Sequence, residues 1–365
     1  MPDVDYGLAD ADPFPFLAIV GQEEMKLALM LSVINPRIGG VLLIGPRGTG
    51  KTTAVRALPR LLPFVERSLC ANGCTEKMLE EGGMDAICPD CLQKVGYGER
   101  LTVVEKVGII ELPLNARLED VVGGVNERVA LEQQRMRLER GILGHADGRI
   151  LYIDEVNLLS DPIADAILDA AAQGHYTVRR GALRQKYRSR FTLIGSLNPE
   201  EGRLRPQLMD RFGLRAVVRG LDDADLRYRT YEMAMAYWQD PAALTAVYRE
   251  ETEALAWEIE QARALLPSVT IGENGRLLAL ALVKKLGIDS ARAEITLFEA
   301  ARAHAAADTR TEVTAVDIQA VALLALRQRT SKVITQFLTE QAAEDKEIMA
   351  MFPPDPQPPT PDLNP

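Results

Sequence analysis

The sequence predicts a parallel α/β sheet with flanking helices, followed by an all-α domain in the C-terminal part. Two observations lead to this fold class. Between about residues 15 and 220, short apolar runs alternate with helical patterns, which is typical of a parallel sheet with helices on both faces. From about residue 222 to 330 the strand patterns end, and Ala, Leu, Glu and Arg dominate, which indicates helices.

Each predicted element depends on the spacing of its apolar residues. Strands are expected at 40–44, 107–112, 149–153 and 191–196, where the residues are mostly apolar or β-branched. Helices are expected where apolar residues recur three and four positions apart, at 23–34, 162–173, 228–238 and 250–266. Pro241 and Pro267 mark breaks in the helical part.

Composition excludes several classes of protein. The 365 residues include 42 Lys and Arg against 52 Asp and Glu, a net charge of −10, which argues against a protein that coats DNA or RNA. No apolar run reaches the roughly 18 residues of a transmembrane helix. The acidic first residues lack the apolar segment of a secretory signal, so we expect a cytoplasmic protein.

A nucleotide-binding loop is predicted within residues 41–52, which read VLLIGPRGTGKT. An apolar strand leads into G-x-x-x-x-G-K-T and a helical pattern follows, so that backbone N–H groups can surround a phosphate. Lys51 can reach the β- and γ-phosphates of ATP, and Thr52 can bind Mg²⁺. A chance glycine-rich turn is the alternative, and the flanking strand and helix argue against it. The expected cofactor-binding residues of the loop are Gly45, Pro46, Arg47, Gly48, Thr49, Gly50, Lys51 and Thr52.

Two acidic residues follow the predicted strand at 149–153. Asp154 can hold Mg²⁺, and Glu155 can orient and deprotonate an attacking water. An acidic helix cap after a buried strand is the alternative, because Asp and Glu favour helix N-termini. Their position about a hundred residues after a phosphate loop favours the nucleotide role.

Asn198 and Arg211 are further candidates for the same site. Asn198 ends the strand FTLIGSLN, where it can position the water or sense the γ-phosphate, although a turn-forming Asn before Pro199 explains it too. Arg211 in LMDRFGL can stabilise transition-state charge at a neighbouring subunit. A salt bridge to Asp210 or a plain surface position is its alternative.

Four cysteines lie in one short stretch, as the pairs Cys70 with Cys74 and Cys88 with Cys91. Two close pairs joined by a short loop suit a tetrahedral zinc site, which we expect to be structural. An iron–sulfur cluster, a redox-switched disulfide and free thiols remain open. The position predicts a surface insertion at 66–98, with no part in hydrolysis.

Longer segments resemble the AAA+ ATPase subunit of magnesium chelatase, the smaller motor or I subunit. They read IVGQEEMKLAL at 19–29, GPRGTGKT at 45–52, ILYIDEVNLL at 150–159, GSLNPEEGRLRPQLMDRFGL at 195–214 and TEVTAVDI at 311–318. The resemblance covers about residues 14–329. It implies an AAA+ P-loop core with a helical lid, and MgATP hydrolysis that drives insertion of Mg²⁺ into protoporphyrin IX, a ligase reaction of chlorophyll and bacteriochlorophyll biosynthesis.

The resemblance also implies roles for the residues already singled out. Lys51 and Thr52 match the Walker A residues, and Asp154 and Glu155 match Walker B. Gln22 lies in the segment that packs near the adenine.

Further roles fall on the second half of the core and on the lid. Asn198 matches sensor 1, and Arg211 matches the arginine finger, with Arg205 near the same interface. Arg292 matches the sensor 2 arginine, but its surroundings read S-A-R-A-E, so that Glu294 takes the place of the family's usual acidic neighbour.

The family also carries two insertions and forms a hexameric ring with partners. One insertion would span 130–144 and the other, a hairpin, 176–190. A solvated strand pair is the plain interpretation of the hairpin, and a loop at the ring's opening that contacts a partner protein is the other. The implied partners are a larger AAA+ subunit with an integrin-like domain and a porphyrin-binding catalytic subunit. The basic residues of the hairpin are Arg179, Arg180, Arg184, Lys186, Arg188 and Arg190.

Two rival functions remain within this framework. A chelatase-like or MoxR-type chaperone would serve another metal, such as cobalt, or another client. A nucleic-acid motor is disfavoured, because no zinc-finger, winged-helix or OB-like segment is present to dock a duplex. The expected organisation is a tail at 1–14, a core at 15–238, a linker helix at 239–265, a lid at 266–330, and a C-terminal helix with a proline-rich disordered tail at 331–365.

Overall fold

The computed structural model describes residues 13–70, 72–125, 138–181, 183–202 and 204–329. Its core is a parallel sheet in the order β4-β5-β8-β1-β9, so the predicted fold class is confirmed. Four of its strands fall in the predicted runs, and β9 was not predicted. Their bounds are β1 Val41–Ile44, β4 Ile109–Glu111, β5 Ile150–Ile153, β8 Thr192–Leu197 and β9 Leu214–Val217.

Both faces of the sheet are buried, because alternate side chains of each strand enter two different apolar clusters. In β1, Val41 and Leu43 join one cluster, and Leu42 and Ile44 join the other. Helices α1 (Glu23–Ile34), α2 (Lys51–Ala57) and α12 (Arg249–Leu265) contribute to the first cluster. Helices α5 (Leu118–Val122), α7 (Ile142–His145), α8 (Asp161–Gln173) and α9 (Pro206–Met209) contribute to the second.

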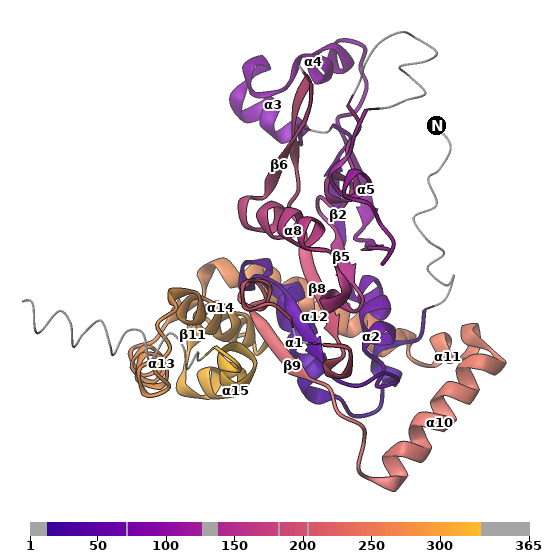
Figure 1. Ribbon diagram of the computed structural model, residues 1–365, viewed down its shortest axis with the longest axis vertical. Coiled ribbons are helices and arrows are strands. Elements are labelled where there is room, and N and C mark those ends of the chain that lie inside the picture. The colour runs from indigo at the N-terminus through magenta and orange to yellow at the C-terminus, as the bar shows by residue number, and fades with distance from the viewer. Residues whose placement is uncertain (1–12, 71, 126–137, 182, 203, 330–365) are drawn as a thin grey trace, which may run out of the picture.

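Two antiparallel strand pairs project from the core in the same direction (Figure 1). In the first, β2 (Phe64–Ser68) pairs with β3 (Thr102–Lys106), and α3 (Glu76–Gly82) and α4 (Pro89–Gly96) lie between them in the chain. We call residues 64–106 the cysteine module. In the second, β6 (His175–Arg180) pairs with β7 (Leu183–Arg188), and we call this pair the basic hairpin.

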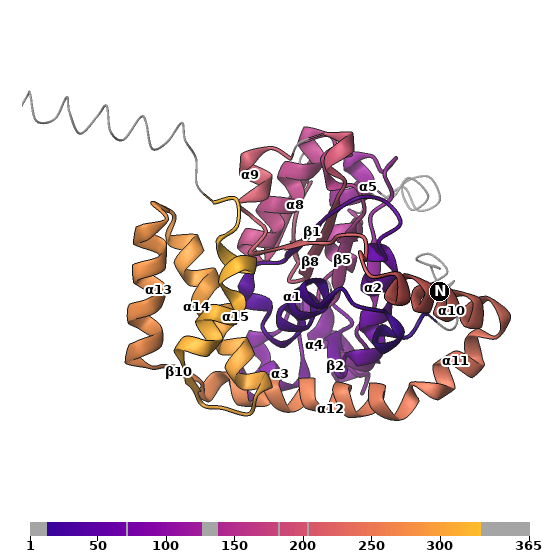
Figure 2. The same ribbon diagram turned by 90° about the horizontal axis from the view of Figure 1, so that it is seen from below.

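The lid is a helical layer beside the sheet, and its buried residues continue the first apolar cluster. Helices α10 (Ala224–Gln239) and α11 (Pro241–Val247) lead from β9 to α12, which runs beneath the core toward the lid (Figure 2). Buried alanines of α14 allow α15 to pack closely against it. The lid consists of β10 Thr270–Ile271, α13 Glu273–Lys285, α14 Ala291–Ala307, β11 Glu312–Val313 and α15 Ala315–Leu326.

Short 3₁₀ turns complete the described secondary structure, at Phe16–Ala18, Pro36–Ile38, Leu58–Leu61, Met84–Ala86, Val156–Leu158, Pro199–Glu201 and Leu266–Ser268. Most of the expected insertion at 130–144 and the C-terminal segment at 331–365 lie outside the described residues. In the described part of the chain, no helix is both long and apolar enough to cross a bilayer.

Candidate functional site

The carboxyl ends of three neighbouring strands carry the predicted nucleotide residues. Strand β1 lies between β8 and β9, and β5 pairs with the other side of β8. The register sets Ile44 opposite Leu197, so the phosphate loop after β1 begins beside Asn198. The amide of Gly45 donates a hydrogen bond of 3.0 Å to the carbonyl of Leu197. A side chain at Gly45 would lie 2.0 Å from the carbonyl oxygen of Val218, so only glycine fits there.

Lys51 begins α2 and folds back over the loop. Its Nζ donates to the carbonyl oxygens of Gly45 at 2.8 Å and Pro46 at 2.6 Å, and the residue is 8% exposed. Burial lowers the pKa of Lys51, and the nearby carboxylates of Asp154 and Glu155 oppose that effect. The ammonium group is thus held inside the loop that would enclose the phosphates.

Asp154 follows β5 and receives hydrogen bonds from three hydroxyl groups. Thr52 Oγ1 donates to Oδ2 at 3.3 Å, Tyr152 donates to Oδ1 at 3.0 Å, and Ser196 also donates to Oδ1. The Thr52 and Tyr152 hydroxyls lie 3.0 Å apart. This arrangement fixes one carboxylate and one hydroxyl next to the phosphate loop, the pair of oxygen ligands that suits Mg²⁺.

Glu155 is held in an unusual backbone conformation. Its φ of 51° is left-handed, which is rare for a residue other than glycine, and its amide donates to Ser196 Oγ at 2.9 Å. Arg47 Nη2 lies 3.1 Å from Glu155 Oε1 and also pairs with Glu201. Glu201, and then Glu155, raise the pKa of Arg47. The strand end therefore aims the Glu155 carboxylate at the loop.

Asn198 forms the turn that was one of the two interpretations of its position. It is 3% exposed, and its Oδ1 accepts a hydrogen bond of 3.3 Å from the amide of Glu200, as a turn-forming residue does. Its position directly after Leu197, the partner of Gly45, places it at the phosphate loop as well.

Sequence reasoning missed Tyr152, Ser196 and Glu201. Tyr152 and Ser196 occupy strand positions whose patterns indicate burial only, so no local signal distinguishes them from core residues. The register of β5 against β8 brings Ser196 to Asp154, whereas Tyr152 lies two residues before Asp154 in the same strand segment. Glu201 stands in the segment NPEEG, where two adjacent glutamates gave no reason to choose either one.

A cavity of about 1330 Å³ opens beside the phosphate loop. Gln22 lines it, and its Nε2 donates to the carbonyl of Arg219 at 2.7 Å. The cavity wall runs from the loop to α10 and suits a planar, largely apolar base next to a phosphate chain. Other lining residues include Gly48, Gly50, Thr52, Ile19, Leu221 and Tyr237.

The predicted arginines Arg211 and Arg292 lie in a different region from the phosphate loop, which we call the arginine edge. Arg292 Nη1 is 3.2 Å from Asp210 Oδ2, directly before Arg211 in the chain, and its side chain is 45% exposed. Among the described residues, the Arg211 guanidinium has no hydrogen-bond or ion-pair partner, and Asp210 pairs with Arg292 and Arg329 instead. Arg205 pairs with Asp161 at 3.0 Å. Arg292 thus pairs with the residue before Arg211, and neither arginine lines the cavity at the phosphate loop of its own chain.

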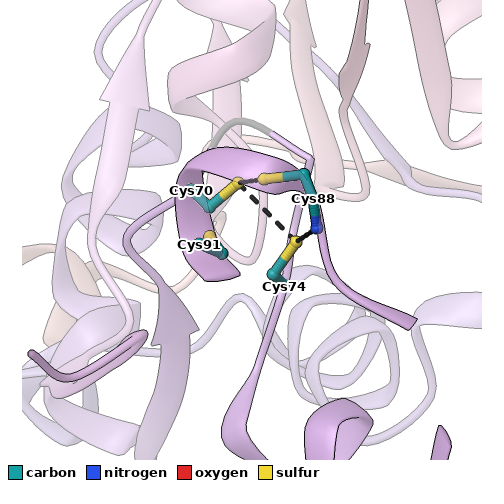
Figure 3. A group of neighbouring side chains, drawn as sticks. All are labelled: Cys70, Cys74, Cys88 and Cys91. Atoms are coloured by element: carbon teal, nitrogen blue, oxygen red, sulfur yellow. Dashed lines mark hydrogen bonds between the residues drawn. The ribbon is translucent and has the colours of Figure 1, made fainter. Parts of the chain in front are cut away.

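The four cysteine sulfurs converge in the cysteine module, as Figure 3 shows, all within 4.8 Å of one another. The Sγ of Cys70 is 3.8 Å from that of Cys74 and 3.5 Å from that of Cys88. The amide of Cys88 donates to Cys74 Sγ at 3.3 Å. Burial raises the pKa of Cys91. Burial also favours the neutral thiol of Cys88, but hydrogen bonds to its sulfur outweigh burial and lower the pKa of Cys88 to about 7.

Comparison with known proteins identifies related chains. The AAA lid domain family matches residues 279–350. The magnesium-chelatase subunit ChlI of Synechocystis is 43% identical over 320 residues, which cover 87% of this chain and 88% of that protein. A ChlI homolog of Methanocaldococcus jannaschii is 42% identical over 316 residues, covering 87% and 85%. A chain from a cryo-EM-based complex of the magnesium chelatase subunits BchI and BchD is 38% identical, with a TM-score of 0.47 and coverage of 89% and 99%.

Identity above 40% across most of both chains shows the family, and the resemblance inferred from the sequence motifs is confirmed. The protein belongs to the ChlI family of magnesium-chelatase ATPase subunits.

Proposed function

We propose that this chain is the MgATP-hydrolysing motor of a magnesium chelatase, whose net reaction inserts Mg²⁺ into protoporphyrin IX. The observation that carries the proposal is the joint presence of two features. The chain is 43% identical to a ChlI subunit over most of its length, and Lys51, Thr52, Asp154 and Glu155 lie at one edge of the sheet.

We call the edge of the sheet that carries Lys51, Thr52, Asp154 and Glu155 the phosphate-loop edge, and each of its residues has a proposed task. Lys51 and the loop amides bind the phosphates, while Thr52 and Asp154 hold Mg²⁺. Bound MgATP supplies the phosphoryl group that is hydrolysed. Glu155 accepts the proton of the attacking water, and Arg47 keeps its carboxylate in place through the 3.1 Å ion pair. Asn198 orients the water, and Gln22 contacts the adenine side of the cavity.

The arginine edge supports a ring. Arg211 has no partner among the described residues and does not line its own chain's cavity, so we infer that it completes the site of a neighbouring copy. Arg292 lies beside it through Asp210, which supports action on the same neighbouring nucleotide rather than on its own. A closed ring of six copies gives every site one such neighbour.

The chelation chemistry belongs to partners in this proposal. We infer that the chain works with a larger AAA+ subunit and a porphyrin-binding subunit, as the name of its ChlI relative, a subunit of a larger enzyme, supports. ATP hydrolysis at the nucleotide site supplies the energy, and in this proposal the nucleotide-site residues do not contact the tetrapyrrole.

The proposal is tested by reconstitution. The chain is mixed with the two other chelatase subunits, protoporphyrin IX and MgATP, and Mg-protoporphyrin is followed by fluorescence. Product is expected with the wild type and not with Lys51→Ala. ATP hydrolysis without product would overturn the chelatase assignment. A parallel reaction with cobalt and a corrin precursor would then test the other client.

We also propose that the four cysteines hold a structural zinc ion. Four Zn–S bonds of about 2.3 Å at tetrahedral angles place sulfurs about 3.8 Å apart, and two of the Sγ–Sγ distances are 3.8 and 3.5 Å. Two N–H groups, of Asn72 and Cys88, donate to the sulfurs of Cys70 and Cys74, which supports thiolate ligands.

The zinc proposal is tested by elemental analysis of the purified chain. About one equivalent of zinc is expected in the wild type and much less in Cys88→Ser with Cys91→Ser. Iron in place of zinc, or no metal, would contradict it. The pair Cys70 and Cys74 and the pair Cys88 and Cys91 can be exchanged for serine separately, and both double variants should lose zinc if all four cysteines are ligands.

A further inference from the structure

We propose that the loop between Cys70 and Cys74 of the cysteine module, here called the metal loop, positions the basic hairpin through Arg188. The inference rests on the proposed metal site and adds a role for it beyond holding the insertion together. It assigns to Arg188 a positioning function that none of the family motifs contains.

The contact is close and directional. Arg188 Nη1 donates a hydrogen bond of 3.0 Å to the carbonyl oxygen of Gly73, which lies in the loop between Cys70 and Cys74. Gly73 has a φ of 75°, and a Cβ there would lie 2.3 Å from Arg188 Nη1 and 2.5 Å from Cδ. The arginine side chain therefore lies directly over the glycine, and a larger residue at position 73 would have to displace it.

The loop that contains Gly73 is shaped around the sulfurs. The amide of Asn72 donates to Cys70 Sγ at 3.2 Å, and the amide of Gly73 donates to the carbonyl of Cys70 at 3.1 Å. Among the described residues of the module, few apolar side chains are buried, namely those of Cys74, Ile87, Cys91 and Leu101. Such a small cluster contributes little packing energy, and Ser68 binds only the two ends of the loop, at the amide of Cys70 and the carbonyl of Cys74. We therefore infer that a bound metal restricts the position of the Gly73 carbonyl.

The other end of the module is fixed to the core. Glu105 of β3 accepts hydrogen bonds from Arg67 at 2.5 Å and from Arg149, next to β5, at 2.8 Å. Glu76 accepts from the amides of Leu101 and Thr102 and closes the base of the insertion. The base of the cysteine module is thus fixed to the core, and the metal loop at its other end contacts the hairpin.

Arg188 is well placed to turn a small change at the loop into a larger one at the hairpin tip. It pairs with His175 at the base of the hairpin, and its Nε lies 3.4 Å from Asp147 on the core side. Tyr176, Val178 and Tyr187 anchor the base in the second apolar cluster, whereas Arg179, Arg180 and Arg184 are exposed. A strand of this length spans about 20 Å, so a tilt of about 10° at the base moves the tip by about 3 Å.

Figure 1 shows the two projections side by side, with α3 and α4 next to β6. The basic tip is the part of the hairpin that can contact a partner protein. We therefore expect metal occupancy of the cysteine module to set the position in which that tip is presented.

Hydrogen–deuterium exchange on the full chain tests this inference without adding a label. Arg188→Ala removes the hydrogen bond to Gly73 and the ion pair to Asp147, so amide exchange in residues 176–187 should increase at least about fivefold. Zinc content and exchange in residues 74–91 should stay at wild-type values. Arg184→Ala, on the same strand but exposed, is the matched control and should change neither. Zinc removal by a chelator should increase exchange in both the module and the hairpin.

Two results would overturn the inference. Wild-type exchange of the hairpin in Arg188→Ala would show that the contact does not position it. A chelated chain in which the module exchanges faster and the hairpin does not would show that the metal has no influence there. A purified chain without metal would instead contradict the zinc proposal, and the Arg188→Ala comparison would still decide the contact by itself.

Discussion

The phosphate-loop edge and the arginine edge differ in how much of their chemistry one chain assembles. At the phosphate-loop edge, a single residue, Asp154, accepts hydrogen bonds from three side chains of the same chain, those of Thr52, Tyr152 and Ser196. At the arginine edge, within the described part of the chain, Arg211 has no partner and Arg292 pairs with Asp210 alone. In the proposed function, the first edge binds the nucleotide and the second acts on the nucleotide that a neighbouring copy has bound.

Because the first edge is complete within a chain, damage to it should abolish function outright. Lys51→Ala removes the buried ammonium group that meets the phosphates, so nucleotide affinity should fall by at least about a hundredfold. Titration with a fluorescent ATP analogue measures this, and Lys26→Ala, a surface lysine paired with Glu23, is the control. Retained affinity in Lys51→Ala would mean that the loop amides suffice.

Arg211→Ala should bind ATP like the wild type but hydrolyse it about a thousandfold more slowly, the usual value of an arginine finger. A mixture of equal amounts of Arg211→Ala and Lys51→Ala chains then tests the comparison directly. If Arg211 acts on a neighbour, random mixed rings contain intact interfaces at about a quarter of positions, and turnover should recover toward that fraction. No recovery in rings shown to be mixed would place Arg211 in its own chain's site.

Arg205→Ala is the matched control for that experiment. Arg205 lies near Arg211 but already pairs with Asp161, so its loss should cost far less turnover.

Glu155→Gln should separate binding from hydrolysis within the first edge. The amide keeps the shape of the side chain but cannot accept the proton, so turnover should fall about a hundredfold to a thousandfold while ATP binding persists. Steady-state phosphate release and nucleotide titration measure the two quantities. Equal turnover in the variant would remove Glu155 from the role of base.

Asp317→Asn should loosen the lid, which carries Arg292, and leave the phosphate-loop edge intact. Asp317 is fully buried and accepts hydrogen bonds from Arg310 at 2.6 Å and from Thr314 at 2.8 Å; the distance to His304 Nδ1 is 2.7 Å. Burial favours the neutral acid, but these partners hold the pKa of Asp317 well below its usual range. Removing the charge should cost about 3 kcal/mol of lid stability at pH 7.

The sign of its pH dependence follows from the lowered pKa. The stabilisation by Asp317 is complete above the unfolded-state pKa of about 4 and is lost as pH falls below that value. Thermal unfolding of the wild type and Asp317→Asn should therefore differ at pH 7 and converge in strong acid. A constant difference across that range would show that the charge of Asp317 is not what stabilises the lid.

The sequence determined the elements that depend on local pattern. The motif from Gly45 to Thr52 and the acids Asp154 and Glu155 were recognisable because a phosphate loop needs its residues close together in the chain. The strands β1, β4, β5 and β8 were recognisable by their apolar runs, and the cysteine pairs by their spacing. Strand β9 was missed because LRAV, with the buried Arg215, does not read as a buried strand.

Only the tertiary structure decided which distant residues meet. Ser196 reaches Asp154 through the register of β5 and β8, Glu201 reaches Arg47 across the loop, and Arg188 reaches Gly73 in an insertion 115 positions away. It also placed Arg292 at Asp210, the residue before Arg211. The physical reason is the same in each case: strand order and helix packing bring these groups together, and no local pattern of residues records that order.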